Sequence, residues 1–447
     1  MMNLRSPLIS RTWKVFSAVL LVGLITVFHL FRADPASARI YIDINAPSVQ
    51  RLKVAIPDFK NFSERSENPD LATSLPSVLS NDLDLSGFFA PMDKAAFLAD
   101  TQGQASLEET RFRDWSVIGT DLLVKAGYTC IGQSLEVEVR LYDILSARQL
   151  LGKRFLGRVD EQRTLMHRVG NEIIYFLTGN KGMFLSKITF VGTGTGNKEI
   201  YIADYDGQNE KQLTSDKTIA LLPRWSPQGD LICFNSYKDG GPMLYLKELL
   251  SGKVRRISDR QGLNAGGSWA PDGKSLALGM THGDNLDIFS IDLTGKILKR
   301  LTNHSGINVS ATYSPDGSRF AFVSNRSGTP QIYIKDLAED REERITFQGN
   351  YNTSPSWSRL NRIVFCGSYE GKFDIFTVDP DGRNLRKLTD GQGDNEEPSW
   401  SPDGRYIVFS SNREGGYHLY IMNANGQNQR RITFMKGQQT SPSWSPF

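Results

Sequence analysis

Few side chains in this sequence have the types and spacing that catalysis or metal binding requires. No Gly-x-Ser-x-Gly pattern is present, so the chain lacks the turn that exposes the nucleophile of many serine hydrolases. The glycine-rich run at residues 192–196 looks like a phosphate-binding loop, but it lies between two expected strands and not ahead of a helix, which rules that interpretation out. We therefore expect no catalytic residues and no cofactor. The five histidines are scattered along the chain, at His29, His167, His282, His304 and His418.

The other candidate ligand residues have structural explanations. Aspartates recur in Pro-Asp-Gly phrases, where proline presets φ, aspartate bonds its own backbone and glycine accepts a positive φ. The three cysteines, Cys130, Cys233 and Cys366, show no metal-ligand spacing, so we expect buried free thiols and no metal site. A formal net charge of +3 without a long basic run argues against nucleic-acid binding.

The elements that carry these residues belong to a tandem repeat. An aromatic residue followed by a phrase related to Ser-Pro-Asp-Gly recurs at intervals of 43 or 44 residues. A second phrase, Leu or Ile followed by Thr or Ser, keeps the same spacing, and periods of about 40–50 residues are typical of propeller blades. Each unit holds four short segments rich in β-branched and aromatic residues, which predicts four strands. The repeated aromatic residues are Trp225, Trp269, Tyr313, Trp357, Trp400 and Trp444.

The ends of the array predict how the ring closes. The first unit starts at its second expected strand, residues 188–191, and the last unit consists only of residues 443–447. We therefore expect the C-terminal strand to supply the inner strand that the first blade lacks. This gives an all-β six-bladed β-propeller at residues 184–447, closed by the C-terminal strand.

Residues 53–180 are expected to form a separate N-terminal α/β domain, so the fold is two-domain. One helix should follow residues 69–70 and end near Gly87, and a second should run from Asp160 as N-cap to Gly179 as C-cap. The second helix places Leu165, Val169, Ile173 and Leu177 on one face. Strands are expected at residues 53–57, 115–119, 121–127 and 135–142, the last from its clean alternation of apolar and polar residues.

Residues 1–38 have the pattern of a secretory signal peptide. Basic residues precede an apolar run at residues 15–31, and residues 36–38 form a small-x-small cleavage site. Because the apolar run is long, an uncleaved anchor is the alternative. The mature chain would begin with a segment at residues 39–52 that alternates like a strand and has no partner defined by the sequence.

The loops between blades are the best candidates for a binding surface. In a propeller, the loops from each outer strand to the next inner strand share one face, and the Pro-Asp-Gly turns occupy the other. These loops are long and differ between blades, and variable loops on a rigid scaffold usually carry function. Their apolar or amide tips suit a protein partner, and packing within the loops is the alternative. The tips are Ile219, Leu221, Leu222, Leu263, Asn264, Ile307, Asn308, Val309, Tyr351 and Asn352.

Together these features resemble the TolB family. The specific points are the end of the α/β domain at residues 175–179, the turn at residues 204–207 and the last phrase at residues 441–446. The repeat phrase alone is less specific, because propellers of the prolyl-oligopeptidase type also carry it. The similarity spans essentially the whole mature chain. It departs at residues 357–361, Trp-Ser-Arg-Leu-Asn, where we expect a different turn in an intact blade.

The resemblance implies a non-enzymatic, periplasmic component of the Tol-Pal system, which maintains the outer membrane and helps the envelope constrict at cell division. In this family the propeller mouth binds the lipoprotein Pal and the mature N-terminus binds TolA, with other outer-membrane proteins as further candidate partners. Carried onto this chain, the Pal surface adds Gly266 to the loop tips Leu221, Leu222, Leu263, Asn264, Asn308, Val309, Tyr351 and Asn352. The TolA-binding residues would be Arg39, Ile40, Tyr41, Ile42, Asp43 and Ile44.

Two other functions are weighed against this one. A hydrolase in which the propeller gates a catalytic domain would need such a domain, and none is recognisable in the sequence. A periplasmic propeller that binds a sugar, peptide or metal would favour several aromatic residues at the mouth. Tyr351 is the only clear one.

Overall fold

The structure is a computed structural model that describes residues 51–63, 68–98, 110–369 and 371–447. All of these residues belong to one compact unit of the chain. The expected signal peptide at residues 1–38, and the TolA-binding residues at positions 39–44, lie outside the described residues. Within the described part of the chain, no helix combines the length and apolar character needed to cross a membrane.

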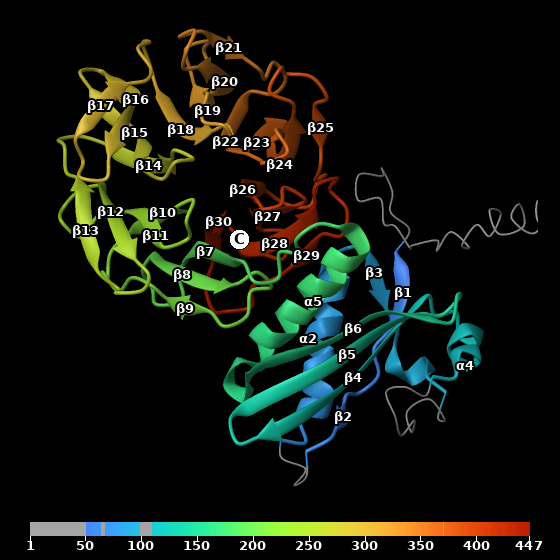
Figure 1. Cartoon of the computed structure of the whole chain (residues 1–447). Coiled ribbons are helices and arrows are strands. Elements are labelled where there is room, and N and C mark those ends of the chain that lie inside the picture. Colours follow the sequence, from blue (N-terminus) through green and yellow to red (C-terminus); the bar gives the residue numbers. More distant parts are fainter. Residues whose placement is uncertain (1–50, 64–67, 99–109, 370) are drawn as a thin grey trace, which may run out of the picture. The chain divides into compact units, whose positions relative to one another are not determined.

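Six four-stranded antiparallel sheets form the ring of the propeller (Figure 1). Strands follow one another from the inside to the outside of each blade, so neighbours in sequence are neighbours in the sheet. The second blade consists of β10 (Ala220–Trp225), β11 (Leu231–Ser236), β12 (Met243–Glu248) and β13 (Val254–Ser258), and the third of β14 (Asn264–Trp269), β15 (Ser275–His282), β16 (Asn285–Asp292) and β17 (Ile297–Arg300). The fourth blade consists of β18 (Asn308–Tyr313), β19 (Arg319–Ser324), β20 (Gln331–Asp336) and β21 (Glu342–Arg344), and the fifth of β22 (Tyr351–Trp357), β23 (Ile363–Tyr369), β24 (Lys372–Val378) and β25 (Arg386–Lys387). The sixth blade consists of β26 (Asn395–Trp400), β27 (Tyr406–Ser411), β28 (His418–Asn423) and β29 (Arg430–Arg431).

The first blade confirms the predicted closure. Its strand order is β30 (Gln439–Trp444), β7 (Lys187–Gly192), β8 (Glu199–Asp204) and β9 (Lys211–Gln212). Strand β30 pairs antiparallel with β7, with Trp444 opposite Ile188. The C-terminal strand therefore joins the two ends of the array, and no blade edge is left open at the seam.

The two repeated phrases hold the blades together in different ways. The aromatic residue packs between blades, and in three blades its indole N–H reaches the inner strand of the preceding blade: Trp225 Nε1 donates to Ser443 O at 3.1 Å, Trp269 Nε1 to Arg224 O at 3.2 Å and Trp400 Nε1 to Ser356 O at 3.0 Å. The threonine of the second phrase forms hydrogen bonds within its own blade. Thr346 Oγ1 accepts from Ile332 N at 2.9 Å and donates to Gln331 Oε1 at 2.8 Å. This buried bond explains why a hydroxyl residue recurs there.

The irregular phrase at residues 357–361 forms the different turn that its sequence predicts. Asn361 takes a left-handed φ of 56°, which glycine takes in the other turns, and asparagine tolerates this conformation better than most residues. Its side chain also accepts a hydrogen bond from Trp357 Nε1 at 3.0 Å. The blade around it, β22 to β25, is complete.

The N-terminal domain is a mixed sheet with order β3-β1-β4-β5-β6, to which β2 adds beside β4. Helices α2 and α5 pack side by side on one face of it (Figure 1). The elements are β1 (Leu52–Ala55), β2 (Lys60–Asn61), α2 (Leu71–Leu85), β3 (Phe89–Pro91), α4 (Phe112–Val117), β4 (Leu122–Ile131), β5 (Ser134–Asp143), β6 (Arg148–Arg158) and α5 (Gln162–Thr178). Two short 3₁₀ turns lie at Lys94–Ala96 and Val159–Glu161.

Two predictions for this domain were wrong. Residues 115–117 belong to helix α4 and not to a strand, and Trp115 packs edge-on against Phe97 at a ring distance of 5.1 Å in the domain core. Asp160 is not the N-cap of α5. It lies in a 3₁₀ turn and pairs with Arg158, and Glu161 precedes the helix without a side-chain cap. The four predicted core residues of α5 are buried, and Gly179 ends the helix with a φ of 72°.

The cysteine prediction is confirmed. Cys130, Cys233 and Cys366 are free and buried. Burial raises the pKa of the Cys233 thiol to about 12, so this group stays protonated and unreactive at neutral pH.

Helix α2 contacts the propeller on both sides of the seam that β30 closes. In the first blade, Tyr205 Oη donates to Asp82 Oδ1 at 2.6 Å. In the last blade, Tyr406 Oη donates to the carbonyl of Ser86 at 2.8 Å, and Arg430 forms an ion pair with Asp84. The N-terminal domain is therefore bonded to the first and the last blade.

The Asp84 contact gives a pH dependence that can be measured. Burial raises the pKa of Asp84, but hydrogen bonds from Arg430 and Arg51 lower it by more, so its pKa lies below the usual 3.8. A carboxyl group with a lowered pKa in the folded protein adds stability above its unfolded pKa, and this stability is lost as pH falls through the folded value. We expect the parent to exceed Asp84→Asn in free energy of unfolding at pH 7, and the difference to shrink below about pH 4. Urea unfolding of both proteins between pH 7 and pH 3 measures it; a difference that does not change with pH would contradict this assignment.

Candidate interaction surface and central channel

The predicted Pal-binding residues differ widely in their exposure to solvent. Tyr351 is 44% exposed and Asn264, Asn308 and Asn352 are each 0% exposed. The other five, Leu221, Leu222, Leu263, Gly266 and Val309, are partly buried. The loop face therefore keeps only part of the predicted surface.

The three asparagines support the loops from within. Asn264 Nδ2 donates to Arg260 O at 2.6 Å, and Asn352 Nδ2 donates to Gln348 O at 2.8 Å, each four residues back. Asn308 Nδ2 bonds Asp287 Oδ1 at 3.2 Å in the preceding blade. An amide looks like a surface group in the sequence, but these three amides are buried and satisfy carbonyls that the loop would otherwise bury unpaired.

Exposed apolar side chains do gather on the loop face, although the sequence reasoning missed two of the largest. Phe347 and Phe434 are 71% and 70% exposed, and the guanidinium groups of Arg344 and Arg431 lie over their rings at 5.0 and 4.8 Å. Both follow the threonine of the second repeated phrase, and this shared place was the signal that could have found them. Ile219 and Ile307, 41% and 48% exposed, were recognised as loop tips.

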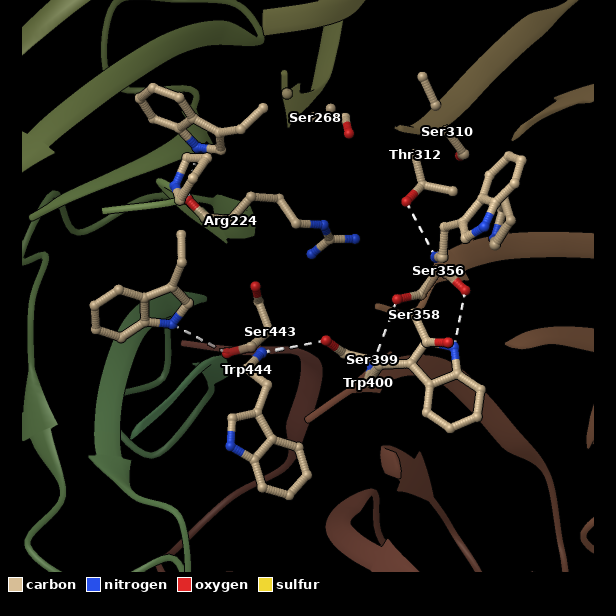
Figure 2. A pocket seen from close by; sticks show the side chains of 18 of the residues that line it. Arg224, Ser268, Ser310, Thr312, Ser356, Ser358, Ser399, Trp400, Ser443 and Trp444 are labelled. Carbon is tan, nitrogen blue, oxygen red and sulfur yellow. Dashed lines mark hydrogen bonds between the residues drawn. The ribbon is translucent and has the colours of Figure 1, made fainter. Parts of the chain in front are cut away.

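The central channel contains a cavity of about 620 Å³. It is lined by the inner strands and by the turns of the opposite face, and of the nine predicted Pal-binding residues only Leu222 and Gly266 reach it. The inner strands are irregular here, because each pairing with its second strand contains a register shift. Such bulges bend a strand and redirect its side chains, which places residues of the inner strands around the channel (Figure 2).

One group of side chains among the described residues has the geometry of a metal site: Asp82, His167 and Asp206. All but one of its ligand atoms are already bonded; His167 Nε2 is buried without a hydrogen-bond partner. His167 Nδ1 lies 2.9 Å from Asp82 Oδ2, Tyr205 bonds the other Asp82 oxygen, and Arg163 donates to Asp206 Oδ2 at 2.6 Å. A cation would have to displace these contacts beside the positive charge of Arg163, so we interpret the group as a buried polar contact between the N-terminal domain and the first blade.

These features define a class of protein: a six-bladed propeller bonded to a small α/β domain, with variable apolar loops on one face and a polar channel. The family description "TolB beta propeller domain" matches residues 175–447, and "TolB amino-terminal domain" matches residues 40–150. The chain belongs to the TolB family.

Individual relatives agree with this membership. The chain is 38% identical over 231 residues to the Tol-Pal system protein TolB of Desulfosudis oleivorans, which is 51% of this chain and 52% of that protein. It is 38% identical over 219 residues to the Tol-Pal system protein TolB of Geobacter sulfurreducens, 48% of this chain and 49% of that protein. The chain thus spans about half the length of the curated relatives it matches. The crystal structure of TolB from Acinetobacter baumannii superimposes with a TM-score of 0.80 and 29% identity, covering 89% of this chain and 97% of that one.

Proposed function

We propose that this protein is a non-enzymatic periplasmic component of the Tol-Pal system that binds Pal on the loop face of its propeller and TolA through residues 39–50. The likeness to TolB of Acinetobacter baumannii over 97% of that chain carries the proposal, since it includes both domains in one chain. This role serves the integrity of the outer membrane and envelope constriction at cell division. The alternative is a periplasmic propeller for a small ligand, which the channel cavity would favour.

The loop face has the composition of a protein-binding surface. Ile307 and Tyr351 are about half exposed, at 48% and 44%, and lie where successive interblade loops meet the inner strands β18 and β22. Both loops are tied to the blades: Leu286 bridges to Ile307, and the ring of Tyr351 meets Phe373 edge-on at 5.8 Å. Rigidly held apolar and aromatic side chains lose little conformational entropy on binding, which is the property of residues that dominate interface energies.

Acidic substitutions on this face test the Pal assignment. We expect the double variant Ile307→Asp, Tyr351→Asp to bind purified Pal at least about tenfold more weakly, because each substitution places a charge in an apolar contact. Calorimetric titration of the protein from residue 39 onward measures the affinity. The matched control is Leu360→Asp, which is 55% exposed on the opposite face and should bind like the parent. Equal affinity for the double variant and the parent would exclude this face as the Pal surface.

The first described residue after the proposed TolA segment is Arg51, and its side chain is bonded. Arg51 Nε donates to Phe89 O at 2.7 Å, and the same guanidinium pairs with Asp84, which also pairs with Arg430 of the last blade. Arg51, which follows the proposed TolA segment in the sequence, therefore lies where the propeller and the N-terminal domain meet. A short alternating segment can bind a partner by adding a strand to its sheet. A ligand on the propeller can change how often such a segment is available.

Truncation tests the TolA assignment. Deleting residues 39–50 should abolish TolA binding and leave Pal binding unchanged, because the deletion stops short of Arg51. Titration of purified TolA and of purified Pal against the parent and the truncated protein measures both affinities. Intact TolA binding by the truncated protein would rule the segment out.

A further inference from the structure

One position in the channel breaks the repeat. The residue that precedes the repeated aromatic is a hydroxyl residue in five blades and an arginine in the blade that begins with β10. All six line the cavity, and Figure 2 shows the guanidinium of Arg224 extending into the open middle of the ring. Packing does not require an arginine there, since serine fills the same place in four blades. The ring consists of Arg224, Ser268, Thr312, Ser356, Ser399 and Ser443.

Arg224 is held in this position by its strand and by one side-chain hydrogen bond. The register shift between Leu221 and Arg224 lies directly before it, and its guanidinium makes one bond, Nη1 to the carbonyl of Pro223 at 2.8 Å. It forms no ion pair with any residue that the structure describes. Burial lowers the pKa of the guanidinium, opposed by the charge of Glu397, and an arginine still keeps its proton at neutral pH. An enclosed cation without a partner is costly, so an anion would be stabilised beside it.

The hydroxyl groups of the ring are arranged as donors. Thr312 Oγ1 accepts from Trp357 N at 3.2 Å, Ser356 Oγ from Trp400 N at 3.5 Å and Ser399 Oγ from Trp444 N at 3.2 Å (Figure 2). A hydroxyl that accepts from the main chain still has its own proton to donate. These protons and the remaining N–H groups of the guanidinium can therefore point into the channel together.

The charged side chains that line the cavity favour an anion. They are Arg224, Arg359 and Glu397; Phe447, which carries the terminal carboxylate, also lines the cavity, so the positive charge is local to the two arginines. Glu397 is engaged elsewhere, because its oxygens accept from Ser441 N at 2.6 Å and Ser441 Oγ at 2.8 Å. Within a channel walled by protein the field of an enclosed arginine is screened less than it is at the surface.

We propose that the central channel of the propeller binds a small oxyanion, inorganic phosphate or a carboxylate, on the Arg224 guanidinium and the surrounding hydroxyl groups. Arginine suits this ligand because its planar N–H groups match two oxygens of a phosphate or carboxylate at once. Arg224 directly precedes the turn at residues 226–229, on the face opposite the interblade loops, whereas Leu222 and Gly266 are the predicted Pal-binding residues that also line the cavity.

Titration calorimetry with phosphate, acetate and chloride tests the site at a fixed ionic strength of about 0.15 M, where exposed charges are largely screened. The parent should bind phosphate, and Arg224→Ser, which restores the residue of four other blades, should bind it at least about tenfold more weakly. The control Arg383→Ser, whose side chain is 84% exposed, should bind like the parent. Arg224→Lys keeps the positive charge but loses the planar guanidinium, so we expect an affinity for phosphate between those of the parent and Arg224→Ser.

The outcomes separate the two sources of the ligand and the alternative. Binding of phosphate alone identifies a tetrahedral oxyanion, and binding of acetate as well identifies a site open to carboxylates. No binding of either anion by the parent overturns the proposal, and so does equal binding by Arg224→Ser. The alternative is that Arg224 is paired internally with Glu397. In that case neither anion binds, and Glu397→Gln lowers the melting temperature when it is made in the parent but not when it is made in Arg224→Ser.

Discussion

Removing residues 439–447 is expected to abolish cooperative unfolding of the propeller. These residues form β30, which pairs with β7 and joins the first blade to the last. Without it the first blade keeps three strands, β7 exposes an unpaired inner edge, and the ring opens. An exposed strand edge is also a template for association between chains, so the truncated protein should aggregate.

The contacts of Trp444 show why the effect is large. Its side chain is 6% exposed, and its indole Nε1 donates to Ser186 Oγ at 2.7 Å. Replacing a buried tryptophan with alanine costs about 3–5 kcal/mol, whereas a typical domain has a total stability of about 5–15 kcal/mol. In the same strand, the carbonyl of Ser443 accepts from Trp225 Nε1 at 3.1 Å, so the deletion also loosens the second blade.

Scanning calorimetry and size-exclusion chromatography measure this result. Trp444→Ala should lower the free energy of unfolding by about 3–5 kcal/mol, and the deletion should leave no sharp transition. The control is Phe447→Ala, which removes a residue that is 52% exposed and lies beyond the strand, and it should change stability little. A truncated protein that stays monomeric and melts like the parent would show that the ring does not depend on β30.

The second large effect is expected at Asp82, where the N-terminal domain meets the first blade. Asp82 is 0% exposed and accepts from Tyr205 Oη at 2.6 Å, with His167 Nδ1 2.9 Å from its other oxygen. Burial raises the pKa of Asp82, an effect that its contacts with His167 and Tyr205 oppose. Asp82→Ala leaves both partners buried without an acceptor, and removing one member of a buried pair costs about 3–5 kcal/mol.

We expect Asp82→Ala to melt in two steps, because the variant weakens the contact that couples the two domains. Calorimetry with a domain-specific probe, such as near-ultraviolet circular dichroism of the tryptophan-rich propeller, resolves the steps. Tyr205→Phe should cost only about 1 kcal/mol, since it removes one hydrogen bond and keeps the ring packed against Phe184. Asp381→Ala, 58% exposed, is the neutral control. A single transition at the parent's temperature for Asp82→Ala would show that this contact does not couple the domains.

Much of the fold was predictable from the sequence because the repeat makes one inference apply six times. The aromatic and threonine positions defined the blades, and the incomplete first and last units defined the closure. The N-terminal domain offered no such redundancy. Residues 115–117 look like a strand by composition, but they belong to helix α4, where Trp115 is buried, because tertiary context overrides a short stretch of β-propensity.

The candidate site likewise has some features that the sequence predicts and others that only the structure reveals. The sequence by itself determined the number of blades, the loop face and the family, because periodicity and turn residues are local properties of the chain. The tertiary structure alone decided which loop residues are available, since burial depends on neighbours that are distant in sequence: Asn308 faces Asp287 and is hidden, whereas Phe347 is exposed. It also brought Arg224 together with hydroxyl groups from the five other blades, which are up to about half the chain away. No local pattern contains that ring, because it exists only when the propeller closes.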